Sequence, residues 1–194
     1  MLGSIAEGVT EATGFLEGQD ALCTVNAFRA MGVTIEGPSN GQIRIQGVGL
    51  DGLKAPEQAL DMGNSGTSIR LISGLLAAQP FDATMTGDAS LTKRPMARVI
   101  TPLQQMGAVI DSDNERPPLT VRGGQSLKGI HYVMPMASAQ VNPAYDWRGC
   151  MLRVEHRSLN RHPHAITPSA CCVDLVTRWI PKMKSSASAA VASS

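Results

Sequence analysis

Three short segments of this 194-residue chain combine small residues with groups that favour an anion. Residues 63–70 read Gly-Asn-Ser-Gly-Thr-Ser-Ile-Arg and run into an apolar stretch, which predicts a loop leading into a helix. The glycines let backbone N–H groups approach a ligand, and the helix dipole favours negative charge there. Asn64, Thr67 and Arg70 are therefore candidate anion contacts, with Arg70 one turn into the helix.

The second and third segments lie at further expected helix starts. Lys93 and Arg94 stand directly before Pro95, which is expected at the first position of a helix. Two cations there oppose the helix dipole, and a bound anion would compensate them. Residues 135–140 read Pro-Met-Ala-Ser-Ala-Gln and place Ser138 and Gln140 at another start. Together the three segments predict a substrate with phosphate or carboxylate groups.

Each segment also has a simpler interpretation. A Gly-Asn-Ser-Gly sequence by itself is more often a turn followed by a helix N-cap. It also lacks the Gly-Lys-Ser/Thr ending of a P-loop. Lys-Arg-Pro alone is usually a solvated turn, and Ser-Ala-Gln alone carries little information. The anion-site hypothesis therefore depends on the three segments together.

An internal repeat of about 75 residues indicates which elements position these segments. Residues 28–35 (Phe-Arg-Ala-Met-Gly-Val-Thr-Ile) match residues 103–110 (Leu-Gln-Gln-Met-Gly-Ala-Val-Ile), and residues 43–47 match residues 119–123. Each copy predicts a helix that ends at Gly32 or Gly107, then two alternating strands joined by a polar turn. A helix over residues 65–78 and a strand over residues 82–86 are expected between the copies. The predicted fold is α/β, built of repeated strand–helix–strand–helix–strand–strand units.

Composition excludes several classes of protein. The chain is 43% apolar and 17% charged with a net charge of +1, which is typical of a globular protein. Near-neutrality gives no reason to expect nucleic acid or a membrane as partner. The longest apolar stretch, residues 71–78, is far shorter than the roughly 20 residues that span a bilayer. The first residues do not resemble a secretory signal, so a cytoplasmic location is expected.

The averages conceal a change near residue 141. Of 19 glycines, 18 lie in residues 1–141, and that part carries 10 Lys/Arg against 13 Asp/Glu. Residues 142–194 carry 7 Lys/Arg against 3 Asp/Glu. The domain prediction is accordingly a lobe over 1–141 and an unrelated tail over 142–194.

In order and spacing, the three segments and residues 102–108 (Pro-Leu-Gln-Gln-Met-Gly-Ala) resemble EPSP synthase over residues 1–141. The Ser-Ala-Gln segment resembles that of glyphosate-tolerant bacterial members. The resemblance implies the enolpyruvyl transferase fold, in which two lobes of three βαβαββ units close over the substrates. This chain would be one incomplete N-terminal lobe. The implied reaction transfers the enolpyruvyl group of phosphoenolpyruvate to shikimate 3-phosphate in the shikimate pathway, with no cofactor or metal.

The resemblance also implies roles for individual residues. Gly66, through its backbone, and Arg94, through a charge-assisted bond, would contact phosphoenolpyruvate. Ser138, Ala139 and Gln140 would line the shikimate 3-phosphate site, with Gln140 also near phosphoenolpyruvate. A residue bulkier than glycine at the position of Gly66 disfavours glyphosate in this family, and the chain retains glycine there.

Parts of the family's active site have no counterpart in the chain. The first family signature, Pro-Gly-Asp-Lys-Ser-Ile-Ser-His-Arg, and the second lobe with its acidic residues are not found in the sequence. No catalytic residue is therefore assigned, and the chain alone is expected to be inactive. The alternative is a non-catalytic anion-binding fragment that needs a complementary C-terminal lobe.

The tail has two further interpretations. The stretch from Arg148 to Glu155 can be back-translated so that a two-base shift reads Gly-Leu-Tyr-Ala-Glu-Gly-Gly, which resembles the family's continuation. We therefore expect a frameshift near Val141 and a disordered tail. The competing hypothesis is a metal-binding tail. It lacks regular ligand spacing and contains adjacent cysteines, which cannot easily reach one tetrahedral ion. Its candidate ligands are His156, His162, His164, Cys171 and Cys172.

Overall fold

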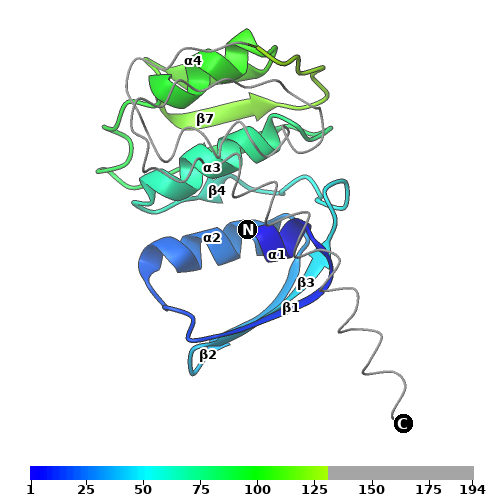
Figure 1. The fold of residues 1–194 in the computed structure, drawn as a ribbon. Coiled ribbons are helices and arrows are strands. Elements are labelled where there is room, and N and C mark those ends of the chain that lie inside the picture. Colours follow the sequence, from blue (N-terminus) through cyan, green and yellow to red (C-terminus); the bar gives the residue numbers. More distant parts are fainter. Residues whose placement is uncertain (131–194) are drawn as a thin grey trace, which may run out of the picture.

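The computed structural model describes residues 1–130, which form two stacked α/β units (Figure 1). The first unit consists of α1 (Leu2–Ile5), β1 (Glu7–Thr13), α2 (Gln19–Ala30), β2 (Thr34–Ser39) and β3 (Gln42–Val48). The second consists of β4 (Leu60–Asp61), α3 (Gly66–Leu76), β5 (Ala83–Thr86), α4 (Ala97–Gln105), β6 (Val109–Asp113) and β7 (Arg116–Arg122).

The two sheets share one topology. Their strand orders are β1-β3-β2 and β4-β5-β7-β6, so β1, β3 and β2 correspond to β5, β7 and β6. Strand β4 pairs in parallel with β5, and the other pairs are antiparallel. The second unit therefore shows the predicted order strand–helix–strand–helix–strand–strand, and the α/β fold is confirmed.

The two predicted glycine caps are confirmed. Gly32 and Gly107 follow helices α2 and α4 with φ values of 87° and 104°, which favour glycine. After α2, the N–H of Val33 donates to the carbonyl of Phe28 over 3.0 Å. The equivalent bond after α4 joins Ala108 to Leu103 over 2.9 Å. Both helices thus end in a Schellman motif.

A second pair of glycines is explained by close backbone approach. Gly47 on β3 and Gly123, directly after β7, are equivalent in the repeat. A Cβ on Gly47 would stand 2.6 Å from the carbonyl oxygen of Gly3 and would also meet the carbonyl of Ala6. A Cβ on Gly123 would collide with the backbone of Phe81. In both units the segment after the first helix therefore crosses the last strand without room for a side chain.

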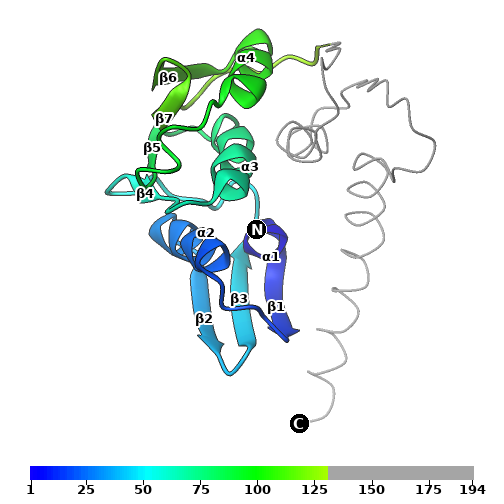
Figure 2. The ribbon, with the colours of Figure 1, turned by 90° about the vertical axis from the view of Figure 1, so that its left-hand side faces the viewer.

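The buried apolar residues form one cluster that extends through both units. Repeat-equivalent residues occupy it alike: Phe28 and Leu103 are both 1% exposed. Figures 1 and 2 show α2 between its own sheet and the second unit, and α3 and α4 on one side of the second sheet. Helix α2 thereby packs close to α3 and β4, which places it beside the first of the predicted anion-binding segments.

No helix within residues 1–130 has the length and apolar character needed to cross a membrane. Ser138, Ala139 and Gln140, the boundary at residue 141 and the candidate metal ligands of the tail lie outside the described residues.

Candidate functional site

The first anion-binding segment forms a tight turn between β4 and α3. Asp61 at the end of β4 accepts the N–H of Gly63 with its Oδ1 over 2.8 Å. The N–H of Ser65 donates to the carbonyl of Met62 over 2.9 Å. Ser65 is the N-cap of α3, and its Oγ accepts the N–H of Ser68 over 3.3 Å. The turn and N-cap of the simpler interpretation are therefore present, and Gly66 is the first residue of the helix.

The second segment is a capped turn fastened to the first. Asp88 Oδ1 accepts the N–H groups of Ser90 and Leu91, each over 2.8 Å, and the N–H of Asp88 donates to the carbonyl of Gly63 over 2.8 Å. A Cβ on Gly87 would stand 2.8 Å from that same carbonyl oxygen, so the two loops touch through their backbones. Hydrogen bonding from Leu91 and Ser90, and more weakly the charge of Arg94, lower the pKa of Asp88.

The prediction for Pro95 was wrong. Helix α4 begins at Ala97 with Met96 as its N-cap, so Pro95 precedes the helix. The N–H of Met96 donates to the carbonyl of Glu115 over 2.8 Å, and this bond to the β6–β7 turn sets where the helix starts. Lys93 and Arg94 therefore belong to the loop after the Asp88 turn and not to the first turn of α4.

The two loops bring Arg70 and Arg94 together at Gly66. Arg70 Nη1 donates to the carbonyl of Gly66 over 3.0 Å. A Cβ on Gly66 would stand 2.9 Å from Arg70 Nη1 and 3.0 Å from Arg94 Nη1. Residues 24 positions apart in sequence thus place two guanidinium groups against the first residue of α3. A side chain at residue 66 would therefore require the two guanidinium groups to move.

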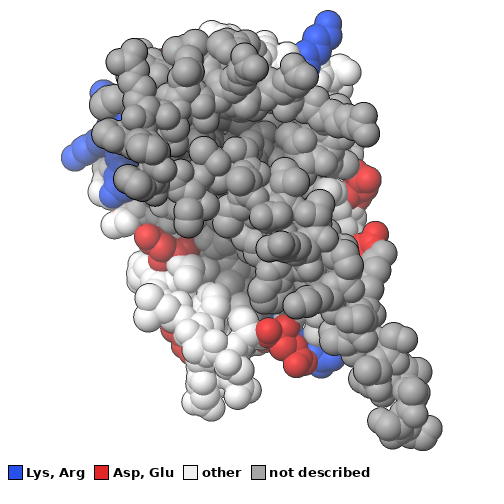
Figure 3. Space-filling model, in the orientation of Figure 1, with Lys and Arg blue, Asp and Glu red and all other residues white. Residues whose placement is uncertain are grey.

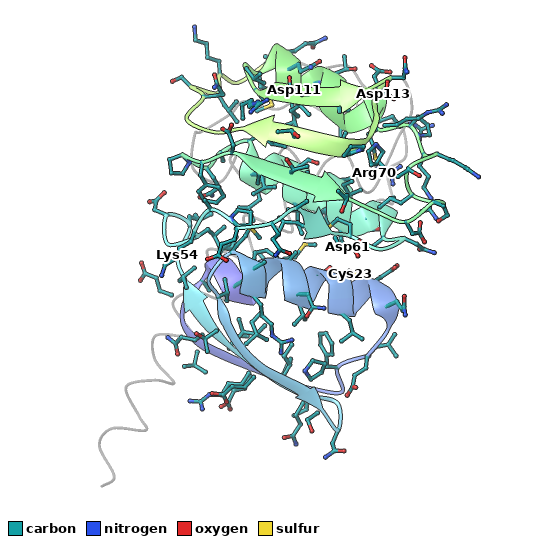
Figure 4. The ribbon with its side chains drawn as sticks, turned by 180° about the vertical axis from the view of Figure 1, so that it is seen from behind. Cys23, Lys54, Asp61, Arg70, Asp111 and Asp113 are labelled. Carbon is teal, nitrogen blue, oxygen red and sulfur yellow. The ribbon has the colours of Figure 1, made fainter. Side chains whose placement is uncertain are left out.

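A third arginine acts on this cluster. The pKa of Arg70 is lowered, first by partial burial and then by the positive charges of Arg94 and Arg98. Figure 4 shows Arg70 on the same side of the molecule as Asp61, which ends β4. In Figure 3, Lys and Arg side chains gather at the edge where the β5–α4 loop lies. An anion bound between these arginines would offset the electrostatic repulsion between their positive charges.

The structure brings some of the predicted site residues into contact and leaves others exposed nearby. Gly66, Arg70 and Arg94 are in contact, whereas Asn64, Thr67 and Lys93 are exposed beside them. Sequence reasoning did not assign Arg98 to the site. Arg98 is an exposed residue in the first turn of α4, and its local sequence carried no signal that linked it to the site.

A metal site is not found in the described part of the chain, where no group of three or more His, Cys, Asp or Glu residues could hold an ion. Cys23 faces Gly63, at whose position a Cβ would lie 2.8 Å from its sulfur. Partial burial, followed by the charges of Asp61 and Asp20, raises the pKa of the Cys23 thiol. The thiol is therefore a weak nucleophile and ligand.

Fold and site together define an α/β protein of two repeated units, the second of them βαβαββ, with an arginine cluster at a helix N-terminus. The family model for EPSP synthase (3-phosphoshikimate 1-carboxyvinyltransferase) matches residues 1–144. The chain belongs to the EPSP synthase family, a family of transferases.

Individual relatives agree with this assignment. The chain is 63% identical over 145 residues to the 3-phosphoshikimate 1-carboxyvinyltransferase of Alkalilimnicola ehrlichii, covering 74% of this chain and 32% of the relative. It is 64% identical over 142 residues to the enzyme of the same name from Methylococcus capsulatus, covering 73% of this chain and 32% of that relative. The solved EPSP synthase of Acinetobacter baumannii superposes with a TM-score of 0.79 at 56% identity, covering 84% of this chain and 37% of the other. The chain thus spans about a third of the length of the curated relatives it matches.

Proposed function

We propose that this chain forms part of the N-terminal lobe of an enzyme that transfers the enolpyruvyl group of phosphoenolpyruvate to shikimate 3-phosphate. The observation that carries the proposal is the convergence of Arg70 and Arg94 on Gly66. A helix start flanked by two guanidinium groups suits phosphate or carboxylate, because charge-assisted hydrogen bonds and the helix dipole act together there. The matched relatives, named 3-phosphoshikimate 1-carboxyvinyltransferases, support the choice of reaction.

Each site residue has a role in this proposal. Gly66 contacts phosphoenolpyruvate through its N–H, and Arg94 through a bond to the phosphate or carboxylate. Ser138, Ala139 and Gln140 line the shikimate 3-phosphate site. The proposal includes a cytoplasmic location, which suits two substrates whose phosphate charges oppose passage through a lipid bilayer.

The supporting residues near Gly66, beyond Arg94, have electrostatic and orienting roles. Arg70 and Arg98 add positive charge, and Asn64, Thr67 and Lys93 lie exposed around the helix start. Asp61 and Asp88, the carboxylates of the two loops, accept backbone N–H groups. The lowered pKa of Asp88 makes it a poor proton acceptor. We propose that groups of a complementary lobe carry out the proton transfers of the reaction.

The test measures phosphate release from phosphoenolpyruvate plus shikimate 3-phosphate. We expect no release above background from the chain alone, and release when the remaining two thirds of the A. ehrlichii relative is added as a separate polypeptide. Turnover by the chain alone would refute the need for a second lobe. The arginine pair at Gly66 also fits a second candidate, a lobe that binds anions without supporting catalysis. It predicts binding but no release in either mixture.

Binding is tested separately by calorimetry with inorganic phosphate and with phosphoenolpyruvate. We expect Arg94→Ala to weaken binding of both by about tenfold or more, because it removes a charge-assisted bond. The matched control is Arg44→Ala, since Arg44 is an exposed arginine that pairs with Glu11 and Glu36 on the first sheet. A parent chain that binds neither anion contradicts the proposal, as does equal binding by the two variants.

A further inference from the structure

A row of three hydroxyl groups connects helix α2 of the first unit to the N-terminus of α3. Thr24 Oγ1 lies 2.7 Å from Ser68 Oγ, which lies 2.8 Å from Ser65 Oγ. Ser65 and Ser68 are buried, and Thr24 is partly buried. The row ends at the residue directly before Gly66, although Thr24 and Ser68 are 44 positions apart in sequence.

The direction of these hydrogen bonds follows from proton counting. A hydroxyl group has one hydrogen to donate. Thr24 donates its own to the carbonyl of Asp20 over 3.0 Å, so it accepts from Ser68. Ser68 has then used its hydrogen, so Ser65 donates to Ser68. Ser65 Oγ in turn accepts the backbone N–H of Ser68, and every hydroxyl hydrogen in the row has an acceptor.

We propose that Thr24, Ser65 and Ser68 are positioning residues that fix the first turn of α3, and with it the N–H of Gly66, in the orientation that receives the anion. The inference rests on the proposed function of that turn. The Ser65 cap alone secures the helix start only to its own chain segment. The bond from Ser68 to Thr24 also attaches the turn to helix α2 of the other unit. Rotation of the turn about the helix axis would therefore leave a buried hydroxyl group without a hydrogen-bond partner.

Two variants break the row and one preserves it. Thr24→Val keeps the shape of the side chain and removes the hydroxyl, Ser68→Ala removes the middle group, and Thr24→Ser keeps the hydroxyl. The matched control is Thr120→Val, because the Thr120 hydroxyl forms a comparable pair with Thr84 over 3.0 Å within the second sheet. All are made in the full 194-residue chain.

The first measurement is the dissociation constant for inorganic phosphate. We expect Thr24→Val and Ser68→Ala to weaken phosphate binding about three- to tenfold, corresponding to the loss of one buried hydrogen bond. Thr24→Ser and Thr120→Val should bind within twofold of the parent. Retention of parental affinity by Thr24→Val, or failure of Thr24→Ser to restore it, would overturn the proposal.

The second measurement needs no ligand and separates this inference from the proposed function. Amide chemical shifts of Gly66 and Thr67 are compared between the unliganded variants. We expect these two amides to move in Thr24→Val and Ser68→Ala and to stay in place in Thr24→Ser and Thr120→Val. Unmoved amides in both row-breaking variants refute positioning even if phosphate binds. A parent that fails to bind phosphate refutes the proposed function, while the amide shifts still decide whether the row positions the turn.

Discussion

Arg70 Nη1 and the carbonyl oxygen of Gly66 are 3.0 Å apart, so the guanidinium of Arg70 folds back over the start of its own helix. This contact places a positive charge against the first residue of α3. The bond spans four positions, and its geometry requires the space that a side chain at residue 66 would occupy.

Gly66→Ala should therefore weaken phosphate binding by about three- to tenfold, because the added Cβ would force Arg70 and Arg94 away from the helix start. Calorimetry with inorganic phosphate measures the change. Gly18→Ala is the steric control, since a Cβ on Gly18 would meet nothing within 4 Å. Equal phosphate affinity in the two variants would show that Arg70 and Arg94 can move to make room for the Cβ without weakening phosphate binding.

Arg98→Gln should reduce the gain in melting temperature that phosphate produces. A ligand raises stability according to its affinity for the folded state, and Arg98 adds to the positive field around Arg70. Melting curves recorded with and without phosphate test this, with Arg44→Gln as the exposed control. A phosphate-induced gain that is unchanged in Arg98→Gln would place Arg98 outside the binding site.

The Asp88 turn should lose stability as the pH falls. Because the pKa of Asp88 is lower in the folded than in the unfolded chain, its charge stabilises the fold above the ordinary aspartate pKa of about 3.9. That stabilisation is lost as pH drops through the folded value.

Asp88→Asn keeps an oxygen acceptor for the N–H groups of Ser90 and Leu91 and removes the charge. The difference in unfolding free energy between parent and Asp88→Asn should be constant above about pH 5 and should shrink below about pH 4. Urea denaturation at stepped pH measures it, with Asp51→Asn as control. A difference that grows on acidification contradicts the assignment.

Gly47→Ala and Gly123→Ala should each destabilise the fold by about 1–3 kcal/mol, since the new Cβ would strike backbone atoms of Ala6 or Phe81 that cannot turn aside. Urea denaturation gives the values, and Gly18→Ala again provides the unobstructed comparison. Stability within about 0.5 kcal/mol of that control would show that the crossing segments can separate.

We propose that residues 142–194 are encoded in a reading frame different from that of the lobe. The family model ends its match at residue 144, close to the change in composition near residue 141. The nucleotide sequence across codons 140–172 tests the proposal: a shift of frame should restore the family's continuation. Codons that cannot encode Gly-Leu-Tyr-Ala-Glu-Gly-Gly in the shifted frame over residues 148–155 would exclude it.

Local patterns in the sequence predicted the elements of this fold well. The helix expected over residues 65–78 and the glycine caps after α2 and α4 follow from backbone rules that act within a few residues, and the structure contains them. The predicted start of α4 was wrong because a hydrogen bond from Met96 to the distant Glu115 determines where the helix begins. Local rules contain no information about such a partner.

Only part of the candidate site was predicted, because local sequence rules do not contain the distant contacts that complete it. Arg70 and Arg94 were found because each belongs to a recognisable segment, but their convergence on one glycine depends on how two loops of the second unit, β4–α3 and β5–α4, pack together. Nothing in the sequence indicated that Thr24 belongs near the site. Its hydrogen bond to Ser68 exists only because the fold brings the two residues together. Residues recruited from another unit are visible only once the fold is known.

The backbone bond from Asp88 to Gly63 has a consequence for how such loops change over generations. With a Cβ on Gly87 only 2.8 Å from the Gly63 carbonyl oxygen, a side chain at residue 87 would require the first loop to change its path as well. Mutations that reshape this site should therefore be inherited in pairs, one in each loop. A lineage that acquires only one of them should pass through a less fit intermediate.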